Sequence, residues 1–185
     1  MRVVVPVPSL IALAAVWVVW SIPFVGLPKA EGPTTIDKRA RWGIVLEGVG
    51  FSFVWSYFAW AGTIPVWRWV AAVPFLLAAP VLSWTSARML GRQWRFDAGL
   101  NADHTLVQRG AYRVVRHPIY ASMFALLLGT GLLLSRLRFV ALAAGFFVIG
   151  TEVRVRIEDA LLASRFGATF EAYKARVPAH IPFIR

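Results

Sequence analysis

Five stretches without a charged side chain constrain this chain more than any other feature of its sequence. They run over Val3–Pro28, Gly48–Trp67, Trp69–Ala87, Pro118–Ser135 and Phe139–Thr151. A helix that crosses a bilayer needs about 20 mostly apolar residues, and the first four stretches are close to that length. The fifth is shorter, and it crosses only if the charged residues from Glu152 onward face protein or water rather than lipid.

The composition agrees with a membrane protein. Hydrophobic residues make up 58% of the chain and charged residues only 16%, whereas soluble domains average roughly 25% charged residues. We therefore expect an all-α fold, an integral membrane bundle of five transmembrane helices.

The basic residues predict how this bundle lies in the membrane. With five crossings, Lys29–Trp42, Arg88–His117 and the segment after Val153 share one side, and they hold 16 of the 20 Lys and Arg residues. Because basic loops face the cytoplasm, we expect a multi-pass protein with its N-terminus outside and its C-terminus cytoplasmic. The net charge of +11 then faces membrane lipids, and we expect no nucleic-acid partner.

The last two crossings predict a helical hairpin. Only Ser135–Arg138 separates them, which favours two antiparallel helices in tight contact. Arg154–Arg165 continues as helix, and Gly167 interrupts it. We divide the chain into three N-terminal transmembrane helices (residues 1–87) and one structural unit (88–185) with a loop, the hairpin and a C-terminal segment. Too few residues lie outside the membrane for a separate soluble domain, so chemistry must take place at the cytosolic face.

Polar residues concentrate at that face. Pro118 opens the fourth crossing and places His117 at a helix N-terminus, where backbone N–H groups attract an anion.

Arg154 and Glu158 are four residues apart on one helix face. The hairpin brings them back beside His117, with Glu152, Arg156 and Asp159 nearby. This arrangement suits a zwitterionic ligand; the alternatives are a basic helix cap under lipid headgroups and an ordinary Arg154–Glu158 salt bridge.

Other candidates are weaker. Glu47 is interpreted as an interfacial residue paired with Arg39 or Arg41. The three histidines lack the spacing of metal ligands and the chain has no Cys, so no metal site is expected. No phosphate-binding glycine loop and no nucleophile elbow are present.

The C-terminal half resembles the isoprenylcysteine carboxyl methyltransferase family, integral-membrane enzymes that use S-adenosylmethionine. The resemblance depends on an ordered series of motifs over about Leu90–Ile184, half the chain. These are Leu-Gly-x-x-Trp (90–94), His-x-Leu-Val (104–107), Gly-x-Tyr (110–112), Arg-His-Pro-x-Tyr (116–120) and the acidic pair 158–159 followed by Leu. Asp159 departs from the family's second Glu, and Asp97 from a Gln in eukaryotic members.

The resemblance implies a cofactor pocket at the cytosolic face and the residues that line it. The cofactor-binding set is His104, Thr105, Leu106, Val107, Tyr112, His117, Pro118, Ile119, Tyr120 and Glu158. Arg154 is implied to bind the acceptor's carboxylate, and Arg154 and Glu158 are the catalytic residues. Asp97 is an uncertain cofactor contact.

The resemblance implies a methyltransferase that moves a methyl group from S-adenosylmethionine to a lipophilic small molecule or lipidated acceptor, such as a prenylcysteine-type carboxylate. A carboxylate is already ionised at pH 7, so Arg154 orients it rather than activates it. A phospholipid amine or a small thiol are alternative acceptors. An NADPH-dependent membrane reductase and a non-enzymatic transporter or scaffold are the alternatives from other classes.

Overall fold

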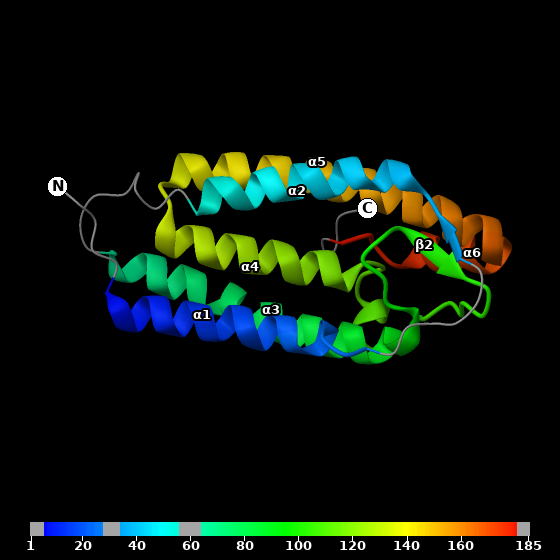
Figure 1. The fold of residues 1–185 in the computed structure, drawn as a ribbon, viewed down its shortest axis with the longest axis horizontal. Coiled ribbons are helices and arrows are strands. Elements are labelled where there is room, and N and C mark those ends of the chain that lie inside the picture. Colours follow the sequence, from blue (N-terminus) through cyan, green and yellow to red (C-terminus); the bar gives the residue numbers. More distant parts are fainter. Residues whose placement is uncertain (1–5, 28–33, 56–63, 181–185) are drawn as a thin grey trace.

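The computed structural model describes residues 6–27, 34–55 and 64–180 of the 185. It is a bundle of helices with one very small sheet (Figure 1). The α-helices are α1 (Val7–Ser21), α2 (Arg41–Val54), α3 (Val66–Leu90), α4 (Pro118–Leu134), α5 (Leu137–Phe166) and α6 (Ala168–Arg176). Strands β1 (Thr34–Ile36) and β2 (Gly99–Asn101) pair antiparallel. Short 3₁₀ turns are η1 (Ile22–Phe24), η2 (Lys38–Ala40), η4 (Gly91–Gln93) and η5 (Gly110–Arg113).

The five long helices alternate in direction, so that α1, α3 and α5 end where α2 and α4 begin (Figure 1). The most extensive contacts join α2 to α5 and α3 to α4. The predicted hairpin of the last two long helices is present, but each arm packs mainly on a helix of the N-terminal half. The two halves of the chain are therefore interleaved.

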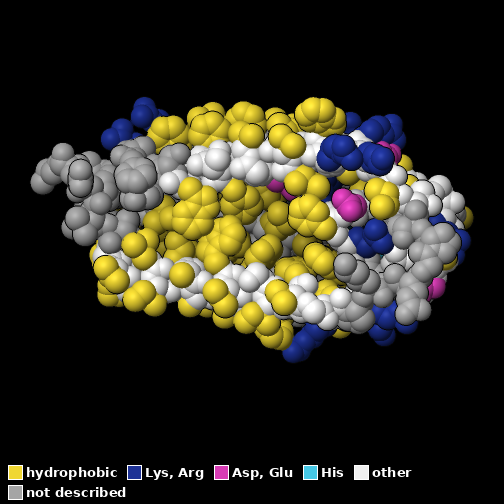
Figure 2. All heavy atoms as spheres, in the orientation of Figure 1, with side chains coloured by type: hydrophobic (Ala, Val, Ile, Leu, Met, Phe, Trp, Pro, Cys, Tyr) yellow, Lys and Arg dark blue, Asp and Glu magenta, His cyan; other side chains and the backbone are white. Residues whose placement is uncertain are grey.

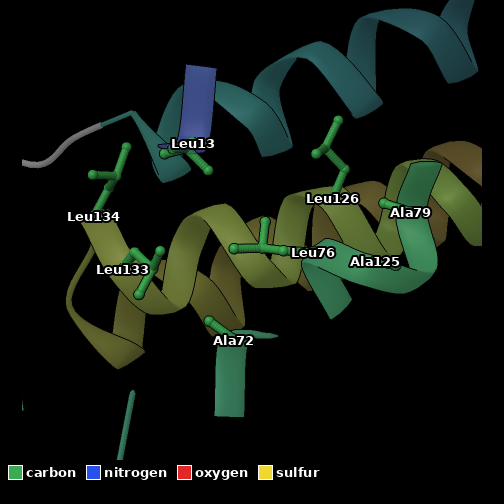
Figure 3. Packing of buried hydrophobic residues seen from close by; sticks show 8 residues of the cluster. All are labelled: Leu13, Ala72, Leu76, Ala79, Ala125, Leu126, Leu133 and Leu134. Atoms are coloured by element: carbon green, nitrogen blue, oxygen red, sulfur yellow. The ribbon is translucent and has the colours of Figure 1, made fainter. Parts of the chain in front are cut away.

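An apolar core lies where α1, α3 and α4 meet (Figure 3). Its buried side chains are Leu13, Ala72, Leu76, Ala79, Ala125, Leu126, Leu133 and Leu134. Two indole N–H groups of α1 also reach α4: Trp17 donates to Thr130 Oγ1 at 3.2 Å and Trp20 to Ser122 Oγ at 3.1 Å. Each such bond stabilises by about 0.5–1.5 kcal/mol, so together they fix α1 against α4.

Helices α2 and α5 approach each other closely because glycines line their contact. A Cβ atom on Gly150 would lie 2.6 Å from the Gly43 carbonyl oxygen, and one on Gly50 would lie 2.8 Å from the Ala143 carbonyl oxygen. Small residues of this kind are typical of helix pairs in membranes. The short separation lets polar side chains on one helix reach the other.

The flank of the bundle is apolar. Figure 2 shows hydrophobic side chains along the helices, with Lys and Arg gathered toward the ends. Large side chains on α1 and α3 are exposed, among them Ile11, Val18, Val70, Leu77 and Val81. Soluble monomers rarely expose large contiguous apolar areas. Within the described part of the chain, two segments are long and apolar enough to cross a membrane, Val7–Phe24 and Val66–Gln93, and α4 is a shorter apolar helix.

The predicted boundaries of the second crossing are wrong. The uncharged stretch begins at Gly48, whereas α2 begins at Arg41 and includes Glu47; residues 56–63 of that stretch lie outside the described residues. Counting charges failed here, and also near Arg68 at the start of α3, because both charged side chains are buried within the protein. The fourth stretch matches α4 to within one residue, and α5 continues to Phe166 as expected.

Candidate functional site

A cavity of about 430 Å³ lies at the end of the bundle where α1, α3 and α5 end and α4 begins. Small-molecule sites typically have about 300–1,000 Å³. Its apolar wall comes from α1, η1 and parts of α4 and α5: Trp20, Phe24, Val25, Ile119, Met123, Leu161 and Leu162. Its polar lining includes Asp97, His104, Tyr112, Arg116, His117, Tyr120, Arg154 and Glu158. The cavity therefore joins a charged region to an apolar one.

The start of α4 positions His117. Pro118 is the first residue of the helix and His117 is its N-cap; proline fits there because the first N–H groups of a helix have no partner within it. The Arg116 N–H donates to the Pro178 carbonyl oxygen and the His117 N–H to that of Ala179, both at 2.8 Å. The segment after α6 thus holds the start of α4 in place.

The side chain of His117 lies between two carboxylates of α5. Its Nε2 is 2.9 Å from Asp159 Oδ1, and its Nδ1 is 3.3 Å from Glu158 Oε2. Burial opposes the charged imidazole, but hydrogen bonds to Asp159 and Glu158 outweigh it and raise the pKa of His117 to about 8. The anion expected at this helix start is therefore supplied by the protein itself.

The two carboxylates differ in what they present to the cavity. Asp159 is buried and also accepts a hydrogen bond from Arg116 Nη2 at 2.9 Å. Glu158 accepts from the Tyr120 hydroxyl, lines the cavity and keeps 24% of its side chain exposed. Burial raises the pKa of each carboxyl, but hydrogen bonds from His117 lower it below its ordinary value. Glu158 therefore supplies negative charge to the cavity.

Arg154 enters the cavity from α5 and is held on three sides. Its Nη1 donates to Glu47 Oε2 at 3.0 Å, and its Nη2 donates to the Phe96 carbonyl oxygen at 2.8 Å. Its guanidinium carbon, Cζ, lies over the Tyr120 ring, 4.7 Å from the ring centre, a cation–π distance. Thr151 Oγ1 donates to the other Glu47 oxygen at 3.0 Å.

The interpretation of Glu47 is wrong, and the alternative of an Arg154–Glu158 salt bridge is not what the structure shows. Glu47 pairs with Arg154 and with neither Arg39 nor Arg41. Arg39, in η2, binds Asp37 at 2.6 Å. Arg154 pairs with Glu47 rather than with Glu158. Spacing along the chain favours neighbours, whereas the tight α2–α5 contact joins residues 107 positions apart.

The loop between α3 and α4 packs beside the cavity. The Thr105 N–H donates to Gln93 Oε1 at 2.6 Å, and Arg165 Nη2 donates to the Ala102 carbonyl oxygen at 2.7 Å, which ties the loop to α5. His104 lines the cavity, and its Nδ1 is buried without a hydrogen-bond partner. Burial lowers the pKa of His104, so this imidazole is neutral at pH 7.

The cavity brings together most of the site residues named from the sequence. His104, Tyr112, His117, Ile119, Tyr120, Arg154 and Glu158 line it, and so does Asp97. Of the site residues in the described ranges, four do not line it: Thr105, Leu106, Val107 and Pro118. Thr105 faces Gln93, and Pro118 is buried in the first turn of α4.

Sequence reasoning missed the residues that α1, η1 and α2 contribute. Trp20 and Phe24 form part of the wall, and Glu47 holds Arg154. Trp residues at helix ends indicate a membrane interface, but nothing in their spacing shows which cavity they cover. No local pattern pairs Glu47 with α5.

The fold and cavity define a helical protein that carries a mixed polar and apolar pocket at one end of an apolar bundle. The chain belongs to the isoprenylcysteine carboxyl methyltransferase (ICMT) family, whose sequence profile matches residues 70–164. This confirms the resemblance drawn from the motifs. The matched region holds His104, His117, Arg154 and Glu158, but it excludes α1 and α2 and hence Glu47.

Similar proteins carry two kinds of name. The chain is 33% identical to the cobalt-zinc-cadmium resistance protein CzcN of Cupriavidus metallidurans over 85% of its own length and 69% of that protein. It is 29% identical to the nickel-cobalt-cadmium resistance protein NccN of Alcaligenes xylosoxydans over 84% and 72%. It is 42% identical to the protein-S-isoprenylcysteine O-methyltransferase of Schizosaccharomyces pombe over 45% and 36%, so it spans about a third of that enzyme's length.

Across the described ranges, no three His, Asp or Glu side chains are grouped to hold a metal ion.

Proposed function

We propose that this protein is an integral-membrane methyltransferase that moves a methyl group from S-adenosylmethionine to a hydrophobic or amphiphilic acceptor. The observation that carries the proposal is the single cavity that joins the His117–Glu158 pair to the apolar wall of α1, α4 and α5. A charged cofactor and a lipophilic acceptor need both kinds of surface within one pocket. A prenylcysteine-type carboxylate is the acceptor that the family name suggests.

The residues present fit the cofactor. Glu158 lines the cavity with an ionised carboxylate, which suits the ammonium group of the methionyl part or a ribose hydroxyl. His117 and Arg116 line the same cavity, and they are bound to the carboxylates of Glu158 and Asp159. Their positive charge still favours the cofactor's carboxylate nearby. The unpartnered Nδ1 of His104 is a buried polar atom suited to a hydrogen bond with the adenosine part. When bound, S-adenosylmethionine supplies a methyl group on a sulfonium that carries its own leaving group.

The protein's own contribution is alignment. Methyl transfer needs the acceptor atom about 3–3.5 Å from the methyl carbon and in line with the bond that breaks. Glu158 and His117 hold one partner on the α4–α5 side. The wall made by Trp20, Phe24 and Met123 holds the other and keeps water out.

We further propose five membrane crossings, with the cavity at the cytosolic face and the N-terminus outside. Arg68 binds the carbonyl oxygens of Leu132 and Ser135 at the end of the bundle opposite the cavity, and Arg136 lies in the turn next to them. Arg138 follows in the first turn of α5, and the other Lys and Arg residues in the described ranges lie toward the cavity end. This separation supports the orientation expected from the positive-inside rule.

Ligand titration of the purified protein in nanodiscs tests the function. We expect saturable binding of S-adenosylmethionine and none of NADPH, as measured by calorimetry. Absence of S-adenosylmethionine binding would disprove the proposal, and saturable NADPH binding instead would favour a reductase.

Two variants test the assigned site. His117→Ala and Glu158→Gln should each weaken S-adenosylmethionine binding at least tenfold, or about 1.5 kcal/mol, the range for losing a charged hydrogen bond. The control is Glu152→Gln, because Glu152 lies on the same helix in an exposed pair with Arg156. If His117→Ala and Glu158→Gln bind S-adenosylmethionine as tightly as the Glu152→Gln control does, the cofactor binds elsewhere.

A further inference from the structure

Arg154 is the only residue that the family resemblance assigns to the acceptor, and its partner in this chain lies outside the matched region. Glu47 comes from α2, before the residues 70–164 that match the family. Glu47 is 3% exposed and Arg154 5%. The pair is therefore a buried ion pair rather than a surface contact.

Both terminal nitrogens of Arg154 are already bound within the protein. A guanidinium binds a carboxylate best through two neighbouring N–H groups at once. Nη1 binds Glu47 and Nη2 binds the Phe96 carbonyl oxygen, while Nε is buried without a hydrogen-bond partner. The Tyr120 ring covers one face. A carboxylate can therefore bind both terminal nitrogens only if it shares them with Glu47 and the Phe96 carbonyl oxygen.

Glu47 is itself held in place. Thr151 donates to its second oxygen at 3.0 Å, and the α2–α5 contact leaves little room for the Arg154 side chain to swing away. A Cβ on Gly43 would lie 2.4 Å from Arg154 Cγ, which shows how closely α2 encloses the stem of that side chain. An acceptor carboxylate would have to displace Glu47 or sit beside it as a second buried anion, and like charges in one buried site repel.

We infer that Glu47 is a specificity-determining residue, which occupies Arg154 and excludes acceptors with a free carboxylate at that position. The acceptor class is then an apolar molecule without a carboxylate next to its nucleophilic atom. This inference rests on the proposed methyltransferase function and departs from the acceptor that the family name suggests.

Binding of two matched probes tests the inference. The probes are an S-prenylated N-acetylcysteine with a free carboxylate and the corresponding carboxamide. Each is titrated into nanodisc-embedded protein saturated with S-adenosylhomocysteine, which cannot donate a methyl group. The wild type should bind the carboxamide at least as tightly as the acid. Glu47→Gln, which keeps the side-chain shape and removes the charge, should tighten binding of the acid at least tenfold relative to the carboxamide.

Thr151→Val is the matched control, because it removes a hydrogen bond to Glu47 but leaves the charge, and it should keep the wild-type preference. A wild type that prefers the acid tenfold or more would overturn the inference, even if Glu47→Gln fails to fold. If the probe with the free carboxylate binds to neither the wild type nor Glu47→Gln, the inference is also overturned. In that case something other than Glu47 excludes the carboxylate. Failure of S-adenosylhomocysteine to bind at all would instead contradict the proposed function.

Discussion

At the scale of single residues, His117 decides the charge of the α4–α5 junction. It is 7% exposed and lies within 3.3 Å of the carboxylates of Glu158 and Asp159. In the unfolded chain its pKa is near 6.5, and in the folded protein it is about 8. The folded state therefore binds a proton more tightly than the unfolded state does.

This difference predicts a loss of stability at alkaline pH. A raised pKa contributes stability that is fully present below pH 6.5 and is lost as the pH rises through about 8. The loss should amount to about 2 kcal/mol. It is measured as a fall in the thermal unfolding midpoint of the detergent-solubilised protein between pH 6 and 9. Asp159→Asn removes one stabilising carboxylate, so its transition should shift to lower pH; identical profiles would show that His117 is not the group that titrates.

The Glu47–Arg154 pair predicts a second residue-scale effect. Arg154→Met leaves the charge of Glu47 buried without a partner, which should destabilise the protein by about 3–5 kcal/mol. Adding Glu47→Gln removes that charge and keeps the acceptor for Thr151, so the double variant should regain at least half of the loss. Thermal unfolding of the wild type, both single variants and the double variant measures the coupling. Simple addition of the two single effects would contradict a direct pair.

Residues of the site were predictable where the chain itself brings them together. The short turn at Ser135–Arg138 returns α5 beside α4, and so the sequence indicates that Glu158 lies near His117. The partner of Arg154 was not predictable, because it depends on which helix packs on α5. Hydrophobic stretches give the number and length of helices, but they do not say which helices are neighbours.

At the scale of elements, the contact between α2 and α5 depends on the absence of side chains. Gly43 and Gly150 let the two backbones approach, and the same approach brings Glu47 to Arg154. The uncharged stretches placed α4 and α5 well but misplaced α2. The reason is physical: a charge count treats every charged residue as solvent-exposed, whereas Glu47 is buried and paired.

A single methyl group in this contact should separate the helices. The Cβ of Gly150→Ala would meet the Gly43 carbonyl oxygen at 2.6 Å and the Glu47 nitrogen at 3.0 Å, both backbone atoms that cannot move alone. We expect a loss of about 1–3 kcal/mol, as for other overpacked cores, seen as a lower thermal unfolding midpoint.

Gly145→Ala provides the control on the same helix. No atom lies within 4 Å of a Cβ at that position, and alanine favours helix over glycine by up to about 1 kcal/mol. Its midpoint should stay the same or rise. Equal losses in both variants would mean that the α2–α5 contact is not what explains the effect of Gly150→Ala.

At the scale of the whole molecule, the length of α5 supports the proposed orientation in the membrane. Its 30 residues span about 45 Å, longer than the ~30 Å hydrocarbon core of a bilayer. Its first part is apolar, and its last turns carry the site residues. With the five crossings proposed above, the helix projects from the membrane on the side of the cavity, where most of the described basic residues lie.

Cysteine labelling tests this orientation directly, because the natural chain contains no cysteine. Leu137→Cys and Ser164→Cys place one thiol near each end of α5, at exposed positions, without changing any charge. In intact cells, a membrane-impermeant maleimide should label Leu137→Cys, and it should label Ser164→Cys only after the membrane is permeabilised. The reverse pattern would invert the orientation and place the cavity outside. Labelling of both thiols in intact cells would mean that α5 does not cross the membrane. It would also contradict the proposal that the charged turns beyond Thr151 extend out of the bilayer.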